Sequence, residues 1–262
     1  MRVMKRWQLC ACGAMTALLG LAPGVSSGQW LNQMDPRIPR TPDGRPNLSA
    51  PVPRAPDGKP DLSGIWLVSD VRWAQNIAVD LKPGDVPFQA WAEARYKHNR
   101  EHPQDEPDAR CLPRGVPKIN AVVYPFKIVQ NSDLVVILYE TFTLYRQIFT
   151  DGRALPADPN PTWLGYSVGK WDGDILQVDT AGFNGKTWLD FDGHPTTERL
   201  HVVERFDRHD FGHMSVQVVI DDPGAYTKPW QTIEQFELLP DTDILEFICN
   251  ENEKSSAHYV GD

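Results

Sequence analysis

The chain is poor in cysteine, short of positive charge and without a long apolar run in its body. Its 26 Lys and Arg residues face 35 Asp and Glu residues, which gives a formal charge of −9. A nucleic-acid partner is therefore not expected, because a polyanion is bound by clustered positive charge. The most apolar stretch, LCACGAMTALLGLAPGV, is shorter than the roughly 20 residues of a membrane-spanning helix, so no membrane span is expected.

The first residues have the pattern of a secretory signal peptide, which we place at residues 1–28. Arg2, Lys5 and Arg6 precede the apolar stretch, and SSGQ supplies small residues for cleavage. Removing this segment takes the formal charge from −9 to −12 and leaves Cys111 and Cys249 as the remaining cysteines. Two cysteines in an exported chain predict one disulfide, and two unpaired buried thiols are the alternative. We expect a periplasmic or secreted protein.

A turn-rich phrase occurs twice before the first apolar strand. Arg40–Ala50 reads RTPDGRPNLSA and Arg54–Gly64 reads RAPDGKPDLSG, and each copy contains a Pro-Asp-Gly turn. Residues 29–60 are accordingly interpreted as a Pro/Gly-rich linker, and residues 61–262 as a single domain. The second copy leads directly into the strand GIWLVSD, whereas the first copy is expected to lie along the surface as a latch or to act as a plain tether.

Hydrophobic periodicity predicts an all-β domain with one N-terminal helix. Apolar and aromatic residues from Phe88 to Tyr96 recur at helical spacing after Pro87. From Ala121 onward the period is two, and turn signals separate the segments. Short links favour an antiparallel up-and-down, lipocalin- or calycin-like barrel of about 8–10 strands, because closure removes exposed edges; a sandwich is the alternative. The expected strands are GIWLV, VVYPFKIVQ, LVVILYETFTLYRQIF, TWLGYSVGKW, DILQVDTAGF, RLHVVERFD, MSVQVVIDD, WQTIEQFELL and ILEFICNE.

Two of these segments mix ionic and apolar residues on one face. Glu140 and Arg146 alternate with apolar positions in ETFTLYRQI, as Glu198 and Glu204 do in ERLHVVERF. If these faces point inward, the charged groups must be paired or have shifted pKa values, which is typical of binding sites. If they point outward, they are solvated ions. The candidate ligand-binding residues are Trp66, Glu140, Tyr145, Arg146, Trp188 and Glu204.

Two further motifs give no firm site. GYSVG matches the nucleophile elbow of α/β-hydrolases, but Ser167 is followed by a hairpin turn and not by a helix, so no nucleophile is expected there. The histidines lack metal-site spacing, and only a site assembled across strands from His194, Glu198 and His213 could be considered. Hydrogen-bonding roles at turns and rims are preferred for these residues. No cofactor is therefore predicted.

Several blocks together resemble an uncharacterised family of secreted proteins from acidobacteria and related environmental bacteria. The blocks include CLPRGVP, YRQIFTDGR, PTWLGYSVGKWDGD, TWLDFDGHP, DFGHM and CNENEK, and the similarity spans roughly Asp61 to Gly261. DLSGIW also resembles the lipocalin-type entry, in which Gly-x-Trp on the first strand plugs the barrel floor. The family resemblance implies an exported single domain, without an established activity or catalytic residues.

Three functions remain open from the sequence. The first is an exported lipocalin-like protein that binds an apolar or amphipathic small molecule in a barrel cavity. The second is an enzyme on the same barrel, an isomerase, lyase or hydrolase, in which His194 acts as acid or base and Glu198 or Asp190 orients it. The third is an envelope interaction module displayed on the Pro-rich segment. In each case the predicted disulfide would pin the CLPRGVP loop across one barrel opening as a lid or rim.

Overall fold

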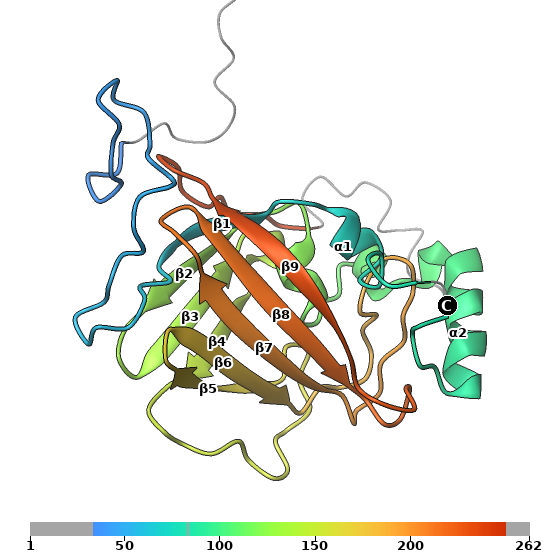
Figure 1. Cartoon of the computed structure of the whole chain (residues 1–262). Coiled ribbons are helices and arrows are strands. Elements are labelled where there is room, and N and C mark those ends of the chain that lie inside the picture. The colour runs from blue at the N-terminus through green and yellow to red at the C-terminus, as the bar shows by residue number, and fades with distance from the viewer. Residues whose placement is uncertain (1–33, 83, 250–262) are drawn as a thin grey trace, which may run out of the picture.

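A computed structural model describes residues 34–82 and 84–249; the predicted signal peptide and most of CNENEK lie outside the described residues. Within those ranges nine strands close into one barrel in chain order, β1 to β9 (Figure 1). The strands are β1 (Gly64–Val68), β2 (Phe126–Gln130), β3 (Leu134–Tyr139), β4 (Tyr145–Phe149), β5 (Tyr166–Asp172), β6 (Ile175–Ala181), β7 (His201–Arg208), β8 (His213–Asp221) and β9 (Trp230–Leu238). The predicted barrel of about 8–10 strands is thus confirmed, and the sandwich is not formed.

One pair of neighbours departs from the antiparallel order. β4 and β5 run parallel, with Ile148 opposite Ser167, whereas β1 pairs antiparallel with β9 to close the barrel. Residues 150–165 carry the chain across between β4 and β5, because a parallel pair cannot be joined by a tight hairpin. The sequence led us to expect a purely up-and-down meander, and the structure departs from that expectation at the β4–β5 pair.

Two strand predictions were wrong in detail. The block from Leu134 to Phe149 is split by the short 3-10 turn η3 (Thr141–Thr143), where Phe142 and Thr143 have positive φ angles of 59° and 50°. β-sheet alternation cannot continue through such backbone. ILEFICNE forms no strand over residues 244–249, the part that the structure describes. The number of strands agrees because one predicted strand became two and one was lost.

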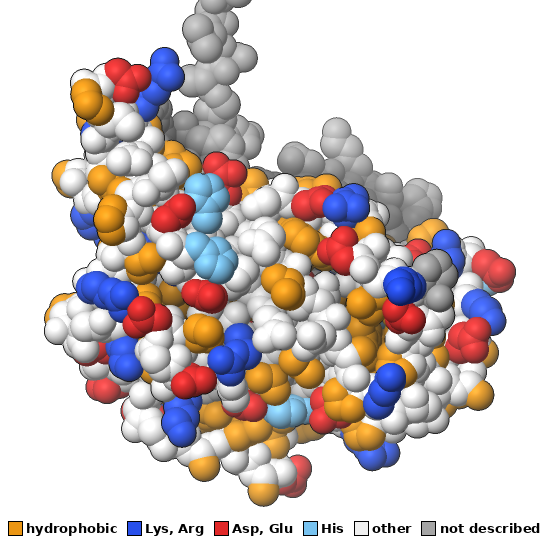
Figure 2. Space-filling view, in the orientation of Figure 1, with side chains coloured by type: hydrophobic (Ala, Val, Ile, Leu, Met, Phe, Trp, Pro, Cys, Tyr) orange, Lys and Arg blue, Asp and Glu red, His pale blue; other side chains and the backbone are white. Residues whose placement is uncertain are grey.

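Alternation is unbroken along the last three strands, and it determines which side chains face the core. Buried and solvent-facing positions alternate along β7, β8 and β9. Glu204 lies opposite Val218 and Glu234 opposite Val216, so both carboxyl groups point inward among valines. On the face shown in Figure 2, charged side chains of both signs are scattered, with hydrophobic side chains between them.

Short helices lie outside the strands at one end of the barrel. The predicted helix near Phe88 is α2 (Ala90–Glu101), and α1 (Arg72–Gln75) and α3 (Lys118–Ala121) are single turns. Two 3-10 turns, η1 (Pro103–Asp105) and η2 (Pro107–Arg110), follow α2. Among the helices of the described residues, none has the length and apolar character needed to cross a bilayer.

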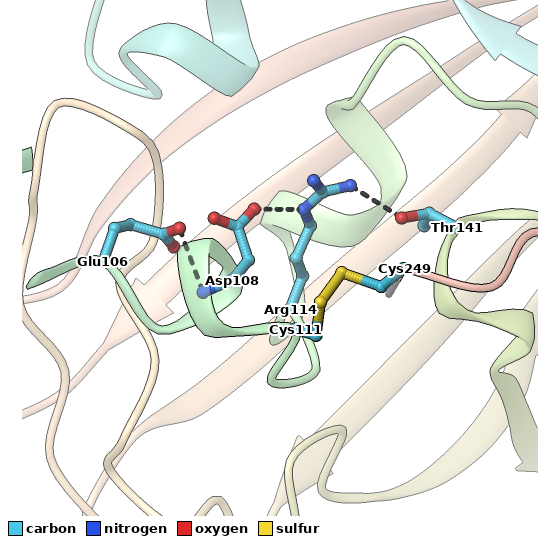
Figure 3. Close-up of a disulfide and its surroundings, with 6 residues drawn as sticks. All are labelled: Glu106, Asp108, Cys111, Arg114, Thr141 and Cys249. Atoms are coloured by element: carbon cyan, nitrogen blue, oxygen red, sulfur yellow. Dashed lines mark hydrogen bonds and ion pairs between the residues drawn. A yellow bond between two sulfur atoms is a disulfide. The ribbon is translucent and has the colours of Figure 1, made fainter. Parts of the chain in front are cut away.

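The predicted disulfide is confirmed. Cys111, directly after η2, is bonded to Cys249 in the segment that follows β9, with a Cα–Cα distance of 5.6 Å (Figure 3). Arg114, three residues further along, forms an ion pair with Asp108 and donates a hydrogen bond to Thr141 at 2.7 Å. The CLPRGVP loop is therefore attached both to the C-terminal segment and to the turn between β3 and β4.

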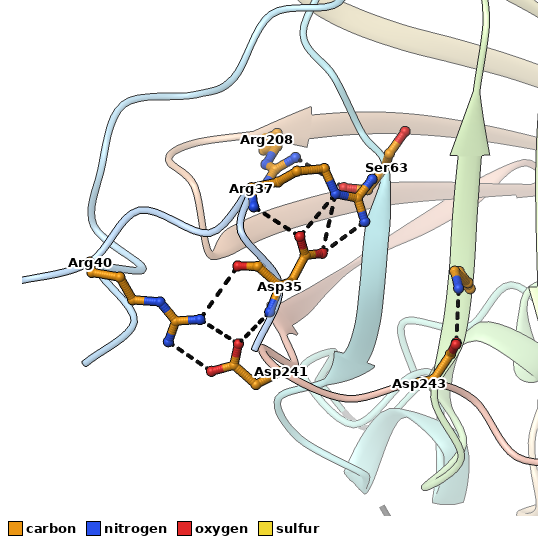
Figure 4. A network of polar contacts seen from close by, with 8 residues as sticks. Asp35, Arg37, Arg40, Ser63, Arg208, Asp241 and Asp243 are labelled. Atoms are coloured by element: carbon orange, nitrogen blue, oxygen red, sulfur yellow. Dashed lines mark hydrogen bonds and ion pairs between the residues drawn. The ribbon is translucent and has the colours of Figure 1, made fainter. Parts of the chain in front are cut away.

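The two copies of the turn-rich phrase form the same local structure. Arg40 bridges Pro46 and Arg54 bridges Pro60, and Gly44 and Gly58 occupy the same turn position with φ angles of 82° and 83°. Each copy is held to the barrel through its arginine. Arg40 pairs with Asp241 after β9 (Figure 4), and Arg54 pairs with Asp174 in the β5–β6 turn. Hydrogen bonds and ion pairs, more than apolar burial, order this segment.

The copies differ in the residues that come after the turn. After the second copy, Trp66 is completely buried, its Nε1 donates to the Leu62 carbonyl at 2.9 Å, and the Arg208 guanidinium lies 4.9 Å from the ring centre. Gly64 has a φ of 146°, and a Cβ there would collide with Leu238. After the first copy, the buried Ala50 accepts a hydrogen bond from Phe211 N at 2.8 Å but has no large side chain to fill the barrel. Trp66 thus lies in the core at the end of the barrel where β9 ends, which we call the floor.

Candidate functional site

His194 and Asp190 form a buried pair at the end of the barrel opposite Trp66. His194 Nδ1 lies 2.6 Å from Asp190 Oδ2, and both side chains are almost completely buried. A carboxylate only accepts hydrogen bonds, so Nδ1 carries the proton and Nε2 is left as the imidazole atom free for another partner. Histidine held in one tautomer by a carboxylate is suited to proton transfer or to binding a polar group.

Backbone amides also hold the Asp190 carboxylate that binds the histidine. Asp190 Oδ1 accepts from the amides of Gly193 and His194 at 2.9 and 3.1 Å, and Oδ2 accepts from Ile77 N at 2.8 Å. The turn depends on Gly193, whose φ is 99° and whose Cβ position is occupied by the side chain of Asn99 on α2. Asp190 and His194 are four residues apart, and this turn brings them into contact in a loop and not in a helix.

Aromatic rings surround the histidine. Phe88 stacks on the imidazole with ring centres 5.5 Å apart, and Tyr96 of α2 lies at 4.4 Å. Trp230 at the start of β9 is 5.8 Å away. The sequence placed Phe88 and Tyr96 on one helical face, but their contact with His194 is tertiary and left no signal in the local pattern.

An open pocket of about 700 Å³ lies against this cluster, with His194 in its lining. One wall comes from the chain before α2 and is largely apolar; the other comes from α2 and Asp192 and is polar. The apolar wall contains Ala78, Val79, Leu81, Val86, Pro87 and Phe88. The polar wall contains Glu93, Tyr96, Lys97, Arg100 and Asp192. The volume is in the range of small-molecule sites.

The predicted catalytic set is brought together in part. His194 and Asp190 are in contact, whereas Glu198 is exposed on the loop before β7. The carboxylate that orients the imidazole is therefore Asp190. Asp192, which the sequence did not single out, accepts from the Tyr96 hydroxyl and pairs with Arg100 at 3.0 Å.

Arg146 and Glu204, the charged residues expected to face inward, bind each other in the barrel core. The Arg146 guanidinium forms a double hydrogen bond with Glu204 and also donates to Ser167 and Thr180. Asn120 donates to Glu204 at 3.0 Å. Ser167, which was not expected to be a nucleophile, is accordingly a buried partner of this network. Each charge has its counter-ion within the protein, as burial requires.

No family model, curated protein or solved structure matches the chain. Function must therefore be inferred from the geometry of the residues themselves.

Glu234 is the exception within the core. Its two carboxyl oxygens are buried without a hydrogen-bond partner in the described residues, and so is Trp230 Nε1. Burial, together with the nearby Glu204 carboxylate, raises the pKa of Glu234 well above its ordinary value. The signal was present in WQTIEQFELL, where Trp230, Thr232, Glu234 and Phe236 share one strand face, but Glu234 was not among the predicted site residues.

The other ligand-binding candidates lie in separate places. Glu140 is at the end of β3, where it accepts from Leu245 N at 3.0 Å and where burial raises its pKa. Tyr145 is 65% exposed on the outside of the barrel, so it cannot line an interior cavity. Trp66 belongs to the floor, and Trp188 lines a smaller pocket of about 320 Å³ beside α2. These four residues do not form one site.

The cross-strand metal set is not assembled. His213 begins β8 near the floor and bonds Asp210 at 2.8 Å, whereas His194 contacts Trp230 at the opposite end of the barrel. Glu198 is exposed on the loop before β7. Within the described ranges, no group of three or more His, Cys, Asp or Glu side chains has a metal-binding arrangement.

A buried lysine connects the disulfide loop to the His194 loop. Lys118 in α3 forms an ion pair with Glu106, lies 3.8 Å from Asp108, and sits 3.8 Å from the centre of the Phe191 ring. Burial lowers the pKa of Lys118 to about 7. Phe191 follows Asp190 directly, so the loop held by Cys111–Cys249 supports the backbone that carries the histidine pair.

Proposed function

We propose that this protein is an exported, lipocalin-like carrier that binds an apolar or amphipathic small molecule at the barrel mouth. The observation that carries the proposal is the pocket of about 700 Å³ with an apolar wall and with His194 in its lining. Binding sites for small molecules combine an apolar lining with a few fixed polar groups, and His194 held by Asp190 is such a group. The mouth of a barrel is a common place for them.

The barrel core offers less support as the site. Inward side chains of β7 to β9 are closely packed, with Val202, Val216 and Val218 completely buried. Arg146 and Glu204, which could have oriented a ligand, are already engaged with each other. We therefore propose that the ligand binds in the pocket that His194 lines and not in the barrel core.

The test is native mass spectrometry on protein purified from its native host, followed by ligand extraction. We expect a bound small molecule in the wild type and its loss in Val79→Trp, which fills the apolar wall. Lys170→Glu on the outer surface of β5 is the matched control and keeps the ligand. A wild type without a ligand, or a Val79→Trp variant that retains it, contradicts binding at this pocket.

A second candidate function is favoured by the His194–Asp190 geometry. The pair has the arrangement of an acid–base dyad: His194 Nε2 would take or give a proton at the substrate, while Asp190 holds the tautomer. Isomerisation, elimination or hydrolysis of a small exported substrate fits this chemistry. General acid–base catalysis contributes about 10²–10⁴-fold, so that loss of rate is expected for His194→Ala.

Turnover separates the two functions. If the protein is an enzyme, a substrate screen finds an activity that falls in His194→Ala and Asp190→Asn while the affinity for substrate changes little. If it is a carrier, the same ligand is released chemically unchanged. Unaltered turnover in His194→Ala removes this residue from the catalytic role.

A further inference from the structure

The walls of the His194 pocket carry unequal charge. Lys97 is paired with Glu93 at 2.6 Å and Arg100 with Asp192 at 3.0 Å, so these four groups neutralise one another. Lys82, also in the lining, forms no ion pair with any described residue. The Asp85 carboxylate beside it accepts a hydrogen bond from the Lys82 backbone amide at 3.3 Å and keeps its negative charge. Of the three Lys and Arg side chains in the lining, Lys82 is thus the one outside an ion pair with a described residue.

The position of this charge relative to the apolar wall determines the kind of ligand that fits. Lys82 follows Ala78, Val79 and Leu81 on the apolar wall, and the side chain is exposed at the pocket. On the face shown in Figure 2, charges of both signs lie close together. A ligand with an apolar body on this wall places its polar group within reach of an ammonium.

We infer that the ligand of the His194 pocket is an amphipathic organic anion, an apolar or aromatic molecule that carries a carboxylate or sulfonate. Its body packs against the wall formed by residues 78–88, and its acidic group pairs with Lys82. A charge-assisted contact of this kind is stronger than a neutral one. The inference rests on the proposed binding function and specifies the ligand class. Cationic amphiphiles are disfavoured at this site, because like charges repel.

Two fluorescent probes of similar shape test the charge preference on the full processed chain. 8-Anilinonaphthalene-1-sulfonate carries the anion, and N-phenyl-1-naphthylamine is neutral. We expect the anion to bind more tightly. Lys82→Gln should weaken the anion roughly two- to fivefold, the scale of one exposed ion pair, and leave the neutral probe unchanged. Lys82→Glu should weaken the anion further, whereas Lys170→Glu changes neither probe.

The outcomes distinguish the ligand class from the proposed function. If both probes bind equally and Lys82→Glu affects neither, while Val79→Trp abolishes binding, the pocket is a binding site but the anion class is wrong. If Val79→Trp, shown by circular dichroism to be folded, binds both probes like the wild type, the probes lie elsewhere and this inference is overturned. If neither probe binds to the wild type, the inference is overturned, because it rests on ligand binding in this pocket.

Discussion

At the scale of single residues, Glu234 is the least favourable group in the core. Its carboxyl group is buried without a hydrogen-bond partner among the residues that the structure describes, and its pKa is raised above the ordinary value of 4.5. The folded protein therefore retains a proton that the unfolded chain releases above about pH 4.5. Stability is lost as the pH rises from that value towards the folded pKa.

Replacing this carboxyl group should stabilise the protein in a pH-dependent manner. We expect Glu234→Leu to gain about 1–3 kcal/mol at neutral pH, the scale of an unsatisfied buried polar group, and to gain less at pH 4. Urea unfolding between pH 4 and pH 8 measures this. Thr232→Val on the same strand face is the control for added apolar volume. A gain that does not change with pH would show that Glu234 is ionised in the folded state or bound by a partner.

The Arg146–Glu204 pair should behave in the opposite way. Glu204→Ala leaves a buried guanidinium without its counter-ion, and we expect a loss of about 3–5 kcal/mol in urea unfolding. The double variant Arg146→Met with Glu204→Leu should recover most of this loss, because neither charge remains. Arg205→Ala, the outward neighbour on β7, should cost less than about 1 kcal/mol. A double variant as unstable as Glu204→Ala would mean that the pair has a role beyond charge balance.

The sequence predicted some of these residues and could not predict others. Strand alternation predicted the inward direction of Arg146 and Glu204, because period two depends only on local backbone. The same rule failed for Glu140, since positive φ angles at Phe142 and Thr143 interrupt the strand between it and Arg146. The ring of Tyr96 over His194 joins segments about a hundred residues apart, and such contacts have no local pattern.

At the scale of elements, the two turn copies hold the barrel with different strength. The Arg40–Asp241 side chains are 22% and 17% exposed, whereas the Arg54–Asp174 side chains are 48% and 62% exposed. Ion pairs shielded from water are weakened less by solvent and salt. The first copy, which the sequence left as a latch or a tether, therefore has the better-shielded contact.

This difference in exposure predicts which of the two arginines contributes more to stability. Arg40→Ala should lower the urea midpoint measurably, and Arg54→Ala should leave it nearly unchanged. Repeating the measurement in 1 M salt should leave most of the gap between the variants, because the shielded Arg40 pair is screened less. Equal effects in the two variants, or a larger effect of Arg54→Ala, would contradict the order that shielding predicts.

Strand positions were predicted well where alternation is strict and poorly at the chain's irregular ends. β6 to β9 follow the predicted segments because hairpin turns and inward valines agree with each other there. ILEFI alternates as a strand does, yet β1 already occupies the outer edge of β9 along Trp66–Val68. No free edge of the sheet was left for a tenth strand, and a sequence pattern cannot show that an edge is occupied.

At the scale of the whole molecule, Cys111–Cys249 joins positions 138 residues apart. We expect Cys111→Ser with Cys249→Ser to lose about 2–5 kcal/mol of stability, the usual scale for removing a native disulfide. Thermal and urea unfolding measure the loss, and reductant should lower the wild-type midpoint but not that of the double variant. Thiol titration of the denatured, unreduced wild type should find no free thiol group at Cys111 or Cys249. Two free thiols there would remove the basis of the prediction.

The parallel β4–β5 pair follows from the odd number of strands in the closed barrel. Around a closed ring, each antiparallel neighbour reverses the strand direction, and the direction must return to itself after one circuit. An even number of strands can do this with reversals alone; nine strands cannot, so at least one pair must be parallel. Residues 150–165 are the place where this chain meets that requirement. Replacing them with a tight hairpin would turn β5 around, and the ring could then close only by losing an antiparallel contact elsewhere.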